Sequence, residues 1–234
     1  WQMKERPRGK PRGLFNFGCI VRFYAGEQFS ILNQIRRSEM TSQIAIQREE
    51  LSAFWHKKMN IWMQLPNFGF ATQDRYQAFC VAKDQLQDTS EALLHHRRVG
   101  FGNPVTTCYL ELWGILQAVA IQQDAIKEMR YALTGNREIK RLGPAWKKMR
   151  DLRNLFAGHP TFNDRSSDAG EIRRSVIARQ QMSYTRIRVT ILCHSSRSHE
   201  TLAIGRLLDE YDTEAACLIK AFLDKLKKQI EQAD

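Results

Sequence analysis

The chain has 234 residues, of which 43% are hydrophobic, so it is long enough to bury a sizeable core within one domain. Its 36 lysines and arginines outnumber 25 aspartates and glutamates, and the resulting formal charge of +11 favours polyanionic partners, nucleic acids above all. A basic surface that docks on an acidic protein is the alternative. The sequence shows neither an apolar run that could span a bilayer nor a secretory signal pattern, so we expect a cytoplasmic protein without a membrane partner.

Residues 1–19 are predicted to form a basic flexible arm, and residues 20–234 a single helical domain. The arm carries closely spaced cations and two prolines, which disfavour helix and sheet: Lys4, Arg6, Arg8, Lys10 and Arg12. Such a stretch is typical of an arm that binds nucleic acid, and a tail without function is the alternative.

Helical periodicity organises the chain beyond the arm. The segment at about 28–64 places apolar residues on one stripe: Ile44, Leu51, Trp55, Met59 and Trp62. A second helix is predicted at about 71–98, with Tyr76, Phe79, Leu86 and Leu93 on its stripe, and it ends before Gly100. A third follows Asn103-Pro104 and carries Leu112, Leu116, Val119, Gln123, Ile126 and Leu133.

Two further helices and a small hairpin complete the predicted fold. A short helix begins at Gly143-Pro144 and carries Trp146, Met149, Leu152 and Phe156, and it ends near Gly158 and Pro160. Residues 161–175 are polar, and the alternation between Tyr184 and Cys193 predicts a half-buried strand that pairs with 175–182. A last helix at about 202–232 repeats Leu208, Tyr211, Ala215, Leu218, Phe222 and Leu226.

The predicted fold is therefore mainly α: a bundle of four to five helices with a small β-hairpin at about 175–193, inserted before the C-terminal helix. Gly-rich phosphate loops, HExxH and paired-carboxylate motifs are missing from the sequence. The five cysteines have no zinc-ligand spacing, so no metal site is expected. Most familiar enzyme classes are thereby excluded.

Residues 153–160, Arg-Asn-Leu-Phe-Ala-Gly-His-Pro, are the one candidate active site, with Arg153, Asn154 and His159 as its catalytic residues. In an ideal helix Asn154 lies about 100° and His159 about 240° around the axis from Arg153, so a continuous helix separates them. We expect Gly158 to leave the helical path with a positive φ and to bring His159 back towards Arg153.

These residue types suit the cleavage of RNA. A guanidinium binds phosphate through paired N–H groups, an amide holds one tautomer or a ribose hydroxyl, and an imidazole titrates near neutrality. The 2′-hydroxyl of RNA is itself the nucleophile, so no cofactor is expected. Arg150, together with Arg186 and Arg188 on the exposed face of the hairpin, is a secondary candidate for substrate binding.

Residues 149–159, Met-Arg-Asp-Leu-Arg-Asn-Leu-Phe-Ala-Gly-His, resemble the signature of the HEPN superfamily of helical-bundle proteins. That signature is an arginine, usually followed by a polar residue, with a histidine a few residues further on. Here residues 155–158 separate Asn154 from His159. The similarity is specific over this segment and only architectural elsewhere, and the long first helix, the basic arm and the hairpin depart from a minimal family domain.

The resemblance implies a metal-independent endoribonuclease whose composite site forms where two protomers of a homodimer bring their motifs together. Many members are toxins or antiviral defence effectors, often beside a cognate antitoxin. Others have lost catalysis and only bind RNA or partners, which is the alternative function here.

A purely structural interpretation competes with this hypothesis. Arg153 would bridge to a carboxylate, Asn154 would cap, and His159 would bond a carbonyl at the helix end. For Arg150 an ion pair at i,i+3 is the commoner use. His95 and His96 suit the dipole at a helix end, while His194 and His199 beside a serine-rich turn are a weaker candidate for an acid and base pair. Trp55, Trp62, Trp113 and Trp146 are expected to be core residues.

Overall fold

The computed structural model describes residues 42–158, 174–178, 180–193 and 196–231. The chain divides into two units, residues 1–40 and 41–234, and every described residue belongs to the second. The predicted basic arm, its boundary at residue 19 and the first part of the predicted helix at 28–64 lie outside the described residues.

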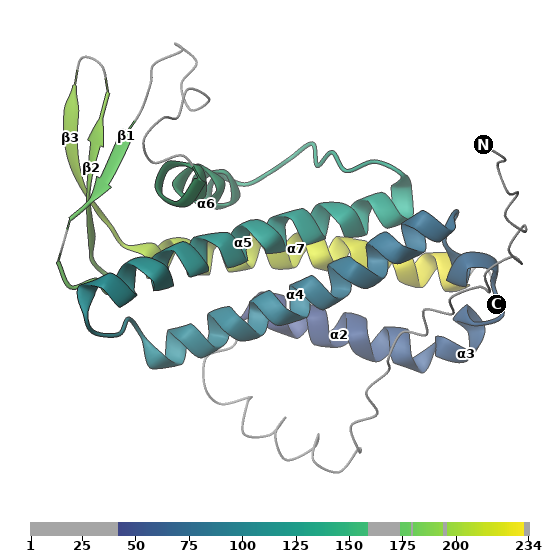
Figure 1. Ribbon diagram of the computed structural model, residues 1–234. Coiled ribbons are helices and arrows are strands. Elements are labelled where there is room, and N and C mark those ends of the chain that lie inside the picture. Colours follow the sequence, from purple (N-terminus) through teal and green to yellow (C-terminus); the bar gives the residue numbers. More distant parts are fainter. Residues whose placement is uncertain (1–41, 159–173, 179, 194–195, 232–234) are drawn as a thin grey trace, which may run out of the picture. The chain divides into compact units, whose positions relative to one another are not determined.

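The described part is mainly helical, with a small sheet before the C-terminal helix (Figure 1). Its helices are α2 (Gln43–Lys57), α3 (Met59–Trp62), α4 (Gln73–Val99), α5 (Val105–Thr134), α6 (Pro144–Arg153) and α7 (Ile204–Glu231). A short 3-10 turn, Pro66–Gly69, precedes α4, and a π turn, Asn154–Gly158, continues α6. Among these described helices, none combines the length and apolar character that crossing a membrane requires.

The helical stripes predicted from the sequence form the core. On α5, Leu112, Leu116 and Val119 are buried, and on α7 the side chains of Leu208 and Tyr211 are buried as well. The predicted first helix is broken, because α2 ends at Lys57 and α3 begins at Met59. The apolar stripe continues across the break, since the indoles of Trp55 and Trp62 pack together with ring centroids 4.8 Å apart.

The predicted hairpin is wrong in one respect, because the sheet has a third strand. Strands β1 (Arg174–Ile177), β2 (Ile187–Leu192) and β3 (Arg197–Leu202) form an antiparallel sheet in the order β1-β2-β3. Strand β2 alternates as predicted, with buried side chains at Ile187, Val189 and Ile191. Strand β3 was not predicted because its sequence, Arg-Ser-His-Glu-Thr-Leu, lacks alternating apolar residues. Its side chains are mostly exposed.

Buried polar groups fix α6 against the long helices. Gln123, predicted on the apolar stripe of α5, is fully buried, and its Nε2 donates to the carbonyl of Trp146 on α6 at 2.8 Å. From the other side, the Glu214 carboxylate of α7 accepts hydrogen bonds from the backbone N–H groups of Ala145 (3.1 Å) and Trp146 (2.7 Å). Glu214 therefore caps the N-terminus of α6 from a distant part of the chain.

Helix α7 caps the N-terminus of α2 as well. Asp212 of α7 accepts hydrogen bonds from the Ser42 hydroxyl at 2.5 Å and from the backbone N–H groups of Gln43 and Ile44. Ser42 in turn accepts from the N–H of Ala45. Two carboxylates on one stretch of α7 thus satisfy the free N–H groups at the beginnings of two other helices.

Replacing Glu214 by alanine is expected to lower the free energy of unfolding by about 1–3 kcal/mol, because the N–H groups at the beginning of α6 lose a charged acceptor. Glu210→Ala is the matched control, since Glu210 lies one turn away on α7 and pairs with exposed Arg206. That control should lose about 0.5 kcal/mol or less. Urea denaturation measures both, and equal losses would show that the cap does not stabilise α6.

Candidate functional site

The sequence motif lies where α6 changes its helical pitch. Arg153 is the last residue of α6, and Asn154 begins the π turn, which ends at Gly158. Within the turn, the consecutive apolar side chains of Leu155 and Phe156 are both buried. Single π turns inside or at the end of α-helices are frequent at functional sites.

The Arg153 side chain is half-buried and contacts neutral acceptors. Its Nε donates to Oε1 of Gln117 on α5 at 3.2 Å, and its Nη1 donates to Oδ1 of Asn154 at 3.2 Å. Among the described residues, no carboxylate lies within ion-pair distance of this guanidinium. The carboxylate partner that a purely structural interpretation would give Arg153 is therefore not found in the described part.

Gly158 lies against the guanidinium. A Cβ atom at this position would lie 2.9 Å from Nη1 of Arg153, so only glycine leaves the arginine undisturbed. The expectation of a positive φ at Gly158 is wrong, because its φ lies outside the left-handed region and the chain leaves the α-helical path through the π turn instead. His159, the predicted acid or base, lies outside the described residues.

Arg150 has a different environment from Arg153. Its guanidinium forms an ion pair with Asp124 of α5, which also lies 3.8 Å from Lys127. The carboxylate partner comes from another helix rather than from position i+3 of the same one. This pair attaches α6 to α5, and a contact between Arg150 and phosphate stays a prediction.

The exposed face of the sheet is basic. Strand register places Arg174, Leu192 and Arg197 in one row across the sheet, and Arg188 opposite Thr201 in another. Between these rows His199 Nδ1 contacts Thr190 Oγ1 at 3.0 Å. Glu200 points to the other face, so the described positions of this face hold no carboxylate. We call Arg174, Arg188, Arg197 and His199 the basic sheet face.

Arg186 and Arg188 are both exposed, as predicted, and Arg186 lies in the tight turn that closes with Ser183 just before β2. Arg174, Arg197 and His199 were missed as neighbours of Arg188. Only a predicted strand at 197–202 would have grouped these residues with Arg188, and the polar composition of that segment does not predict one. His194 lies outside the described residues.

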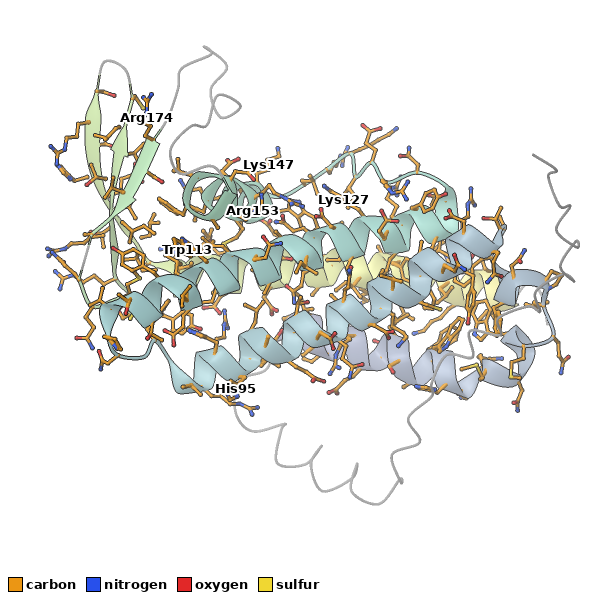
Figure 2. The ribbon with its side chains drawn as sticks, in the orientation of Figure 1. His95, Trp113, Lys127, Lys147, Arg153 and Arg174 are labelled. Atoms are coloured by element: carbon orange, nitrogen blue, oxygen red, sulfur yellow. The ribbon has the colours of Figure 1, made fainter. Side chains whose placement is uncertain are left out.

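The expectation that Trp113 is a core residue is wrong, because 41% of its side chain is exposed. It lines a groove of about 680 Å³ between the first half of α5 and strand β1, which we call the Trp113 groove. The other walls include Tyr109, Phe156 of the π turn and Val176 of β1. Figure 2 labels Trp113 on α5 and Arg153 on α6.

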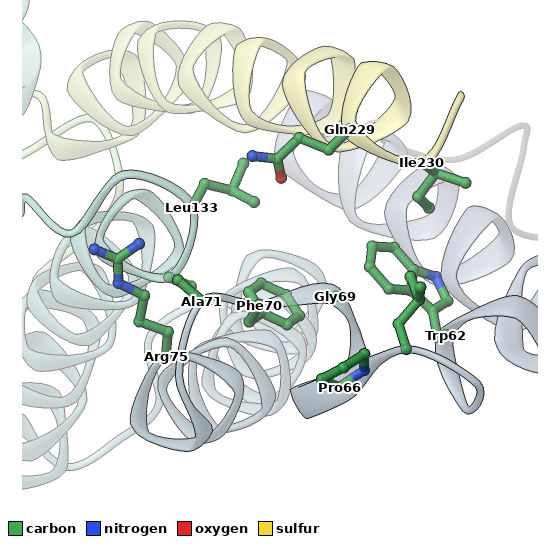
Figure 3. A pocket seen from close by; sticks show the side chains of 11 residues that line it. Trp62, Pro66, Gly69, Phe70, Ala71, Arg75, Leu133, Gln229 and Ile230 are labelled. Carbon is green, nitrogen blue, oxygen red and sulfur yellow. The ribbon is translucent and has the colours of Figure 1, made fainter. Parts of the chain in front are cut away.

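A second hollow of about 400 Å³ lies at the C-terminal end of α5, beside α3 and the 3-10 turn that precedes α4 (Figure 3). Trp62, Phe70, Leu133 and Ile230 make it mainly apolar, and Arg75 is the one charged side chain among its described lining residues. The Arg75 guanidinium packs so closely on Gly135 that a Cβ there would lie 2.0 Å from Nη2. The hollow offers no acid and base pair and suits binding rather than catalysis.

His96 belongs to a small half-buried cluster at the end of α4. Its Nδ1 lies 2.5 Å from the hydroxyl of Tyr184, and its Nε2 lies 3.9 Å from Glu111, which also accepts from the backbone N–H of Gly102. Burial lowers the pKa of His96, against the opposing effect of Glu111, and raises the pKa of Tyr184 to about 12. The cluster joins the end of α4 to the turn before β2, which is a structural role.

The described residues contain no group of three or more His, Cys, Asp or Glu side chains placed to hold a metal ion. Their cysteines, Cys80, Cys108, Cys193 and Cys217, are free thiols. Cys19 lies outside the described residues.

The lowered pKa of His96 predicts a pH-dependent stability. Below about pH 6.5 His96 binds a proton in the unfolded chain more readily than in the folded protein. The free energy of unfolding should therefore fall as the pH drops towards about 5. In His96→Gln this part of the dependence should disappear, whereas exposed His95→Gln should keep it. Urea denaturation of the three proteins between about pH 7.5 and 5 measures the difference, and parallel curves would contradict the assignment.

Comparison of the chain with protein-family models, with curated proteins and with solved structures finds no match in any of the three.

Proposed function

We propose that this protein is a metal-independent endoribonuclease of the HEPN type, which acts in the cytosol on RNA. The support is the motif Arg153-Asn154 with His159, its position at the end of a helix in a mainly helical fold, and the basic charge of the chain. The proposal extends the resemblance noted in the sequence to the whole described bundle, in which the motif helix α6 packs on α5 and α7.

The observation that carries the proposal is the state of Arg153. Its guanidinium is fixed by neutral oxygens of Gln117 and Asn154, and these bonds use Nε and Nη1. Nη2 has no partner among the described residues, and the positive charge has no counterion among them. A fixed arginine without a carboxylate partner in the described part of the chain is suited to bind a phosphate, whereas the charge of Arg150 is already neutralised by Asp124.

The proposed reaction is transesterification within RNA. His159 as general base takes the proton of the 2′-hydroxyl, the 2′-oxygen forms a bond to phosphorus, and the bond from phosphorus to the 5′-oxygen breaks. The leaving 5′-oxygen takes a proton from a general acid, and the products are a 2′,3′-cyclic phosphate and a free 5′-hydroxyl. Arg153 stabilises the charge that develops on the phosphate, and Asn154 positions Arg153 through its side-chain oxygen.

We further propose a composite site in a homodimer, in which the His159 of one protomer and of its partner face the same RNA strand. A cytosolic ribonuclease of this kind is a hazard to its own cell, which fits a toxin or an antiviral effector under the control of an antitoxin or defence-complex partner. The alternative is a non-catalytic protein that binds RNA or a partner. The ion-paired state of Arg150 favours this alternative, because it leaves fewer cations at the motif for catalysis.

We expect wild-type protein to cleave cellular RNA in excess EDTA and to leave 2′,3′-cyclic phosphates. His159→Ala should reduce the rate about 10²–10⁴-fold because a general acid or base is lost, and Arg153→Gln about 10²–10³-fold because transition-state charge is no longer stabilised. His95→Ala and Arg98→Gln, two exposed residues at the end of α4, are the matched controls and should leave the rate unchanged.

RNA cleavage that persists in His159→Ala would sink the assigned mechanism. Binding of RNA without cleavage by any of the proteins, with the wild type folded, would favour the non-catalytic alternative instead.

Gly158→Ala tests the contact between the π turn and Arg153. The added Cβ must displace the guanidinium, so we expect cleavage to slow about 10-fold or more, while the fold is retained. Gly114→Ala on α5 is the matched control, because its Cβ meets no atom within 4 Å. That substitution should leave the rate unchanged and raise the free energy of unfolding by about 0.5–1 kcal/mol. Similar rates for both variants would show that the position of Arg153 is unimportant.

A further inference from the structure

The Trp113 groove lies next to Arg153. Trp113 and Gln117 are one helical turn apart on α5, about 6 Å along its axis, and therefore lie on the same face. Gln117 accepts a hydrogen bond from Arg153, and Phe156 of the π turn forms a wall of the groove. A ligand whose anionic group reaches Arg153 can therefore place a neighbouring planar group against the exposed indole.

On its other side the groove meets the sheet. Strand β1 forms its outer wall, and Val176 of that strand is 55% exposed. Ser175 donates to the carbonyl of Leu155 at 2.6 Å, and the Tyr109 hydroxyl donates to the carbonyl of Ile177 at 2.8 Å, so both sides of the groove are joined. Val176 lies in the middle row of the exposed face, between the rows that carry Arg174 and Arg188.

The three features occur in a fixed order: a cation at the π turn, an exposed aromatic in an apolar groove, and a set of arginines on the sheet. In Figure 2, Arg153, Trp113 and Arg174 come from α6, α5 and β1. The groove itself is lined by α5, by β1 and by Phe156 of the π turn that follows α6. An apolar protein segment would satisfy the groove but not the cations on its two sides. Single-stranded nucleic acid satisfies all three, because its phosphates alternate with planar bases.

We propose that the Trp113 groove is a nucleobase subsite for single-stranded RNA. The base stacks on the indole of Trp113, its phosphate lies at Arg153, and the next phosphates of the strand lie along the basic sheet face. The inference rests on the proposed ribonuclease function, because it names the part of the substrate that sits beside the reacting phosphate. It assigns to Trp113 the role of holding substrate rather than of chemistry.

The test separates binding from cleavage by the use of RNA with 2′-O-methyl groups, which has no 2′-hydroxyl to attack phosphorus. Affinity is measured by fluorescence anisotropy with a short labelled single strand. Trp113→Ala should bind about 5- to 150-fold more weakly, in line with the loss of one stacked base, and Trp113→Phe should recover most of the affinity. Val81→Ala, at another exposed apolar residue on α4, is the matched control and should bind as wild type does.

A second measurement does not depend on a variant that folds. Ultraviolet cross-linking of wild type to the same RNA, with 5-bromouridine in place of uridine, should attach the strand to the peptide that contains Trp113. A cross-link elsewhere, together with equal affinity of Trp113→Ala and wild type, would overturn the proposal. A loss of dimer in Trp113→Ala at unchanged RNA affinity would also overturn it and assign the groove to a second copy of the chain.

The two proposals fail in different ways. If wild type cleaves RNA and Trp113→Ala cleaves and binds equally well, the nuclease stands and the subsite is wrong. If wild type does not cleave but cross-links through Trp113, the subsite stands and the catalytic mechanism is wrong.

Discussion

The arrangement of the described helices depends on two carboxylates of α7. A helix begins with N–H groups that have no partner within the helix, and the dipole adds a partial positive charge there. Asp212 neutralises the beginning of α2, and Glu214 that of α6. Because both acceptors come from one helix, α7 determines where two others begin. Gln123 and the ion pair between Arg150 and Asp124 then bind α6 to α5.

The position of α6 explains why its two arginines differ. Arg150 faces α5 at the level of Asp124 and is neutralised by it. Arg153 lies at the C-terminal end of the α-helix, where the dipole favours a cation even without a carboxylate. The fold thus stabilises an arginine that has no carboxylate partner among the described residues. The two residues, one turn apart in sequence, are consequently suited to different tasks.

The sequence predicted the elements whose burial is periodic. Leu112, Leu116 and Val119 on α5 and Ile187 and Val189 on β2 lie on the faces that their spacing indicates. Strand β3 could not be predicted in this way, since its stability comes from backbone pairing with β2 rather than from buried side chains. Trp113 was misassigned because a tryptophan beside a helical stripe has the same sequence pattern whether it faces the core or a groove.

The candidate site was predictable in composition but not in geometry. The motif identified Arg153 and Asn154 as neighbours in sequence, yet the Arg153 side chain also donates to Gln117, which comes from another helix. The π turn also escaped prediction, because nothing in Asn-Leu-Phe-Ala-Gly distinguishes it from an α-helical turn that ends at a glycine. Long-range contacts and helix pitch are settled by packing, which a single segment does not encode.

The hydrogen bond from Ser175 to the carbonyl of Leu155 has a consequence for how the protein opens. A four-residue edge strand has little stability of its own, and β1 relies on this bond and on that from Tyr109 for its attachment to the helices. Local unfolding that releases β1 therefore removes a wall of the groove and a support of the π turn in the same event. We therefore expect hydrogen exchange in the two segments to be coupled through a single opening equilibrium.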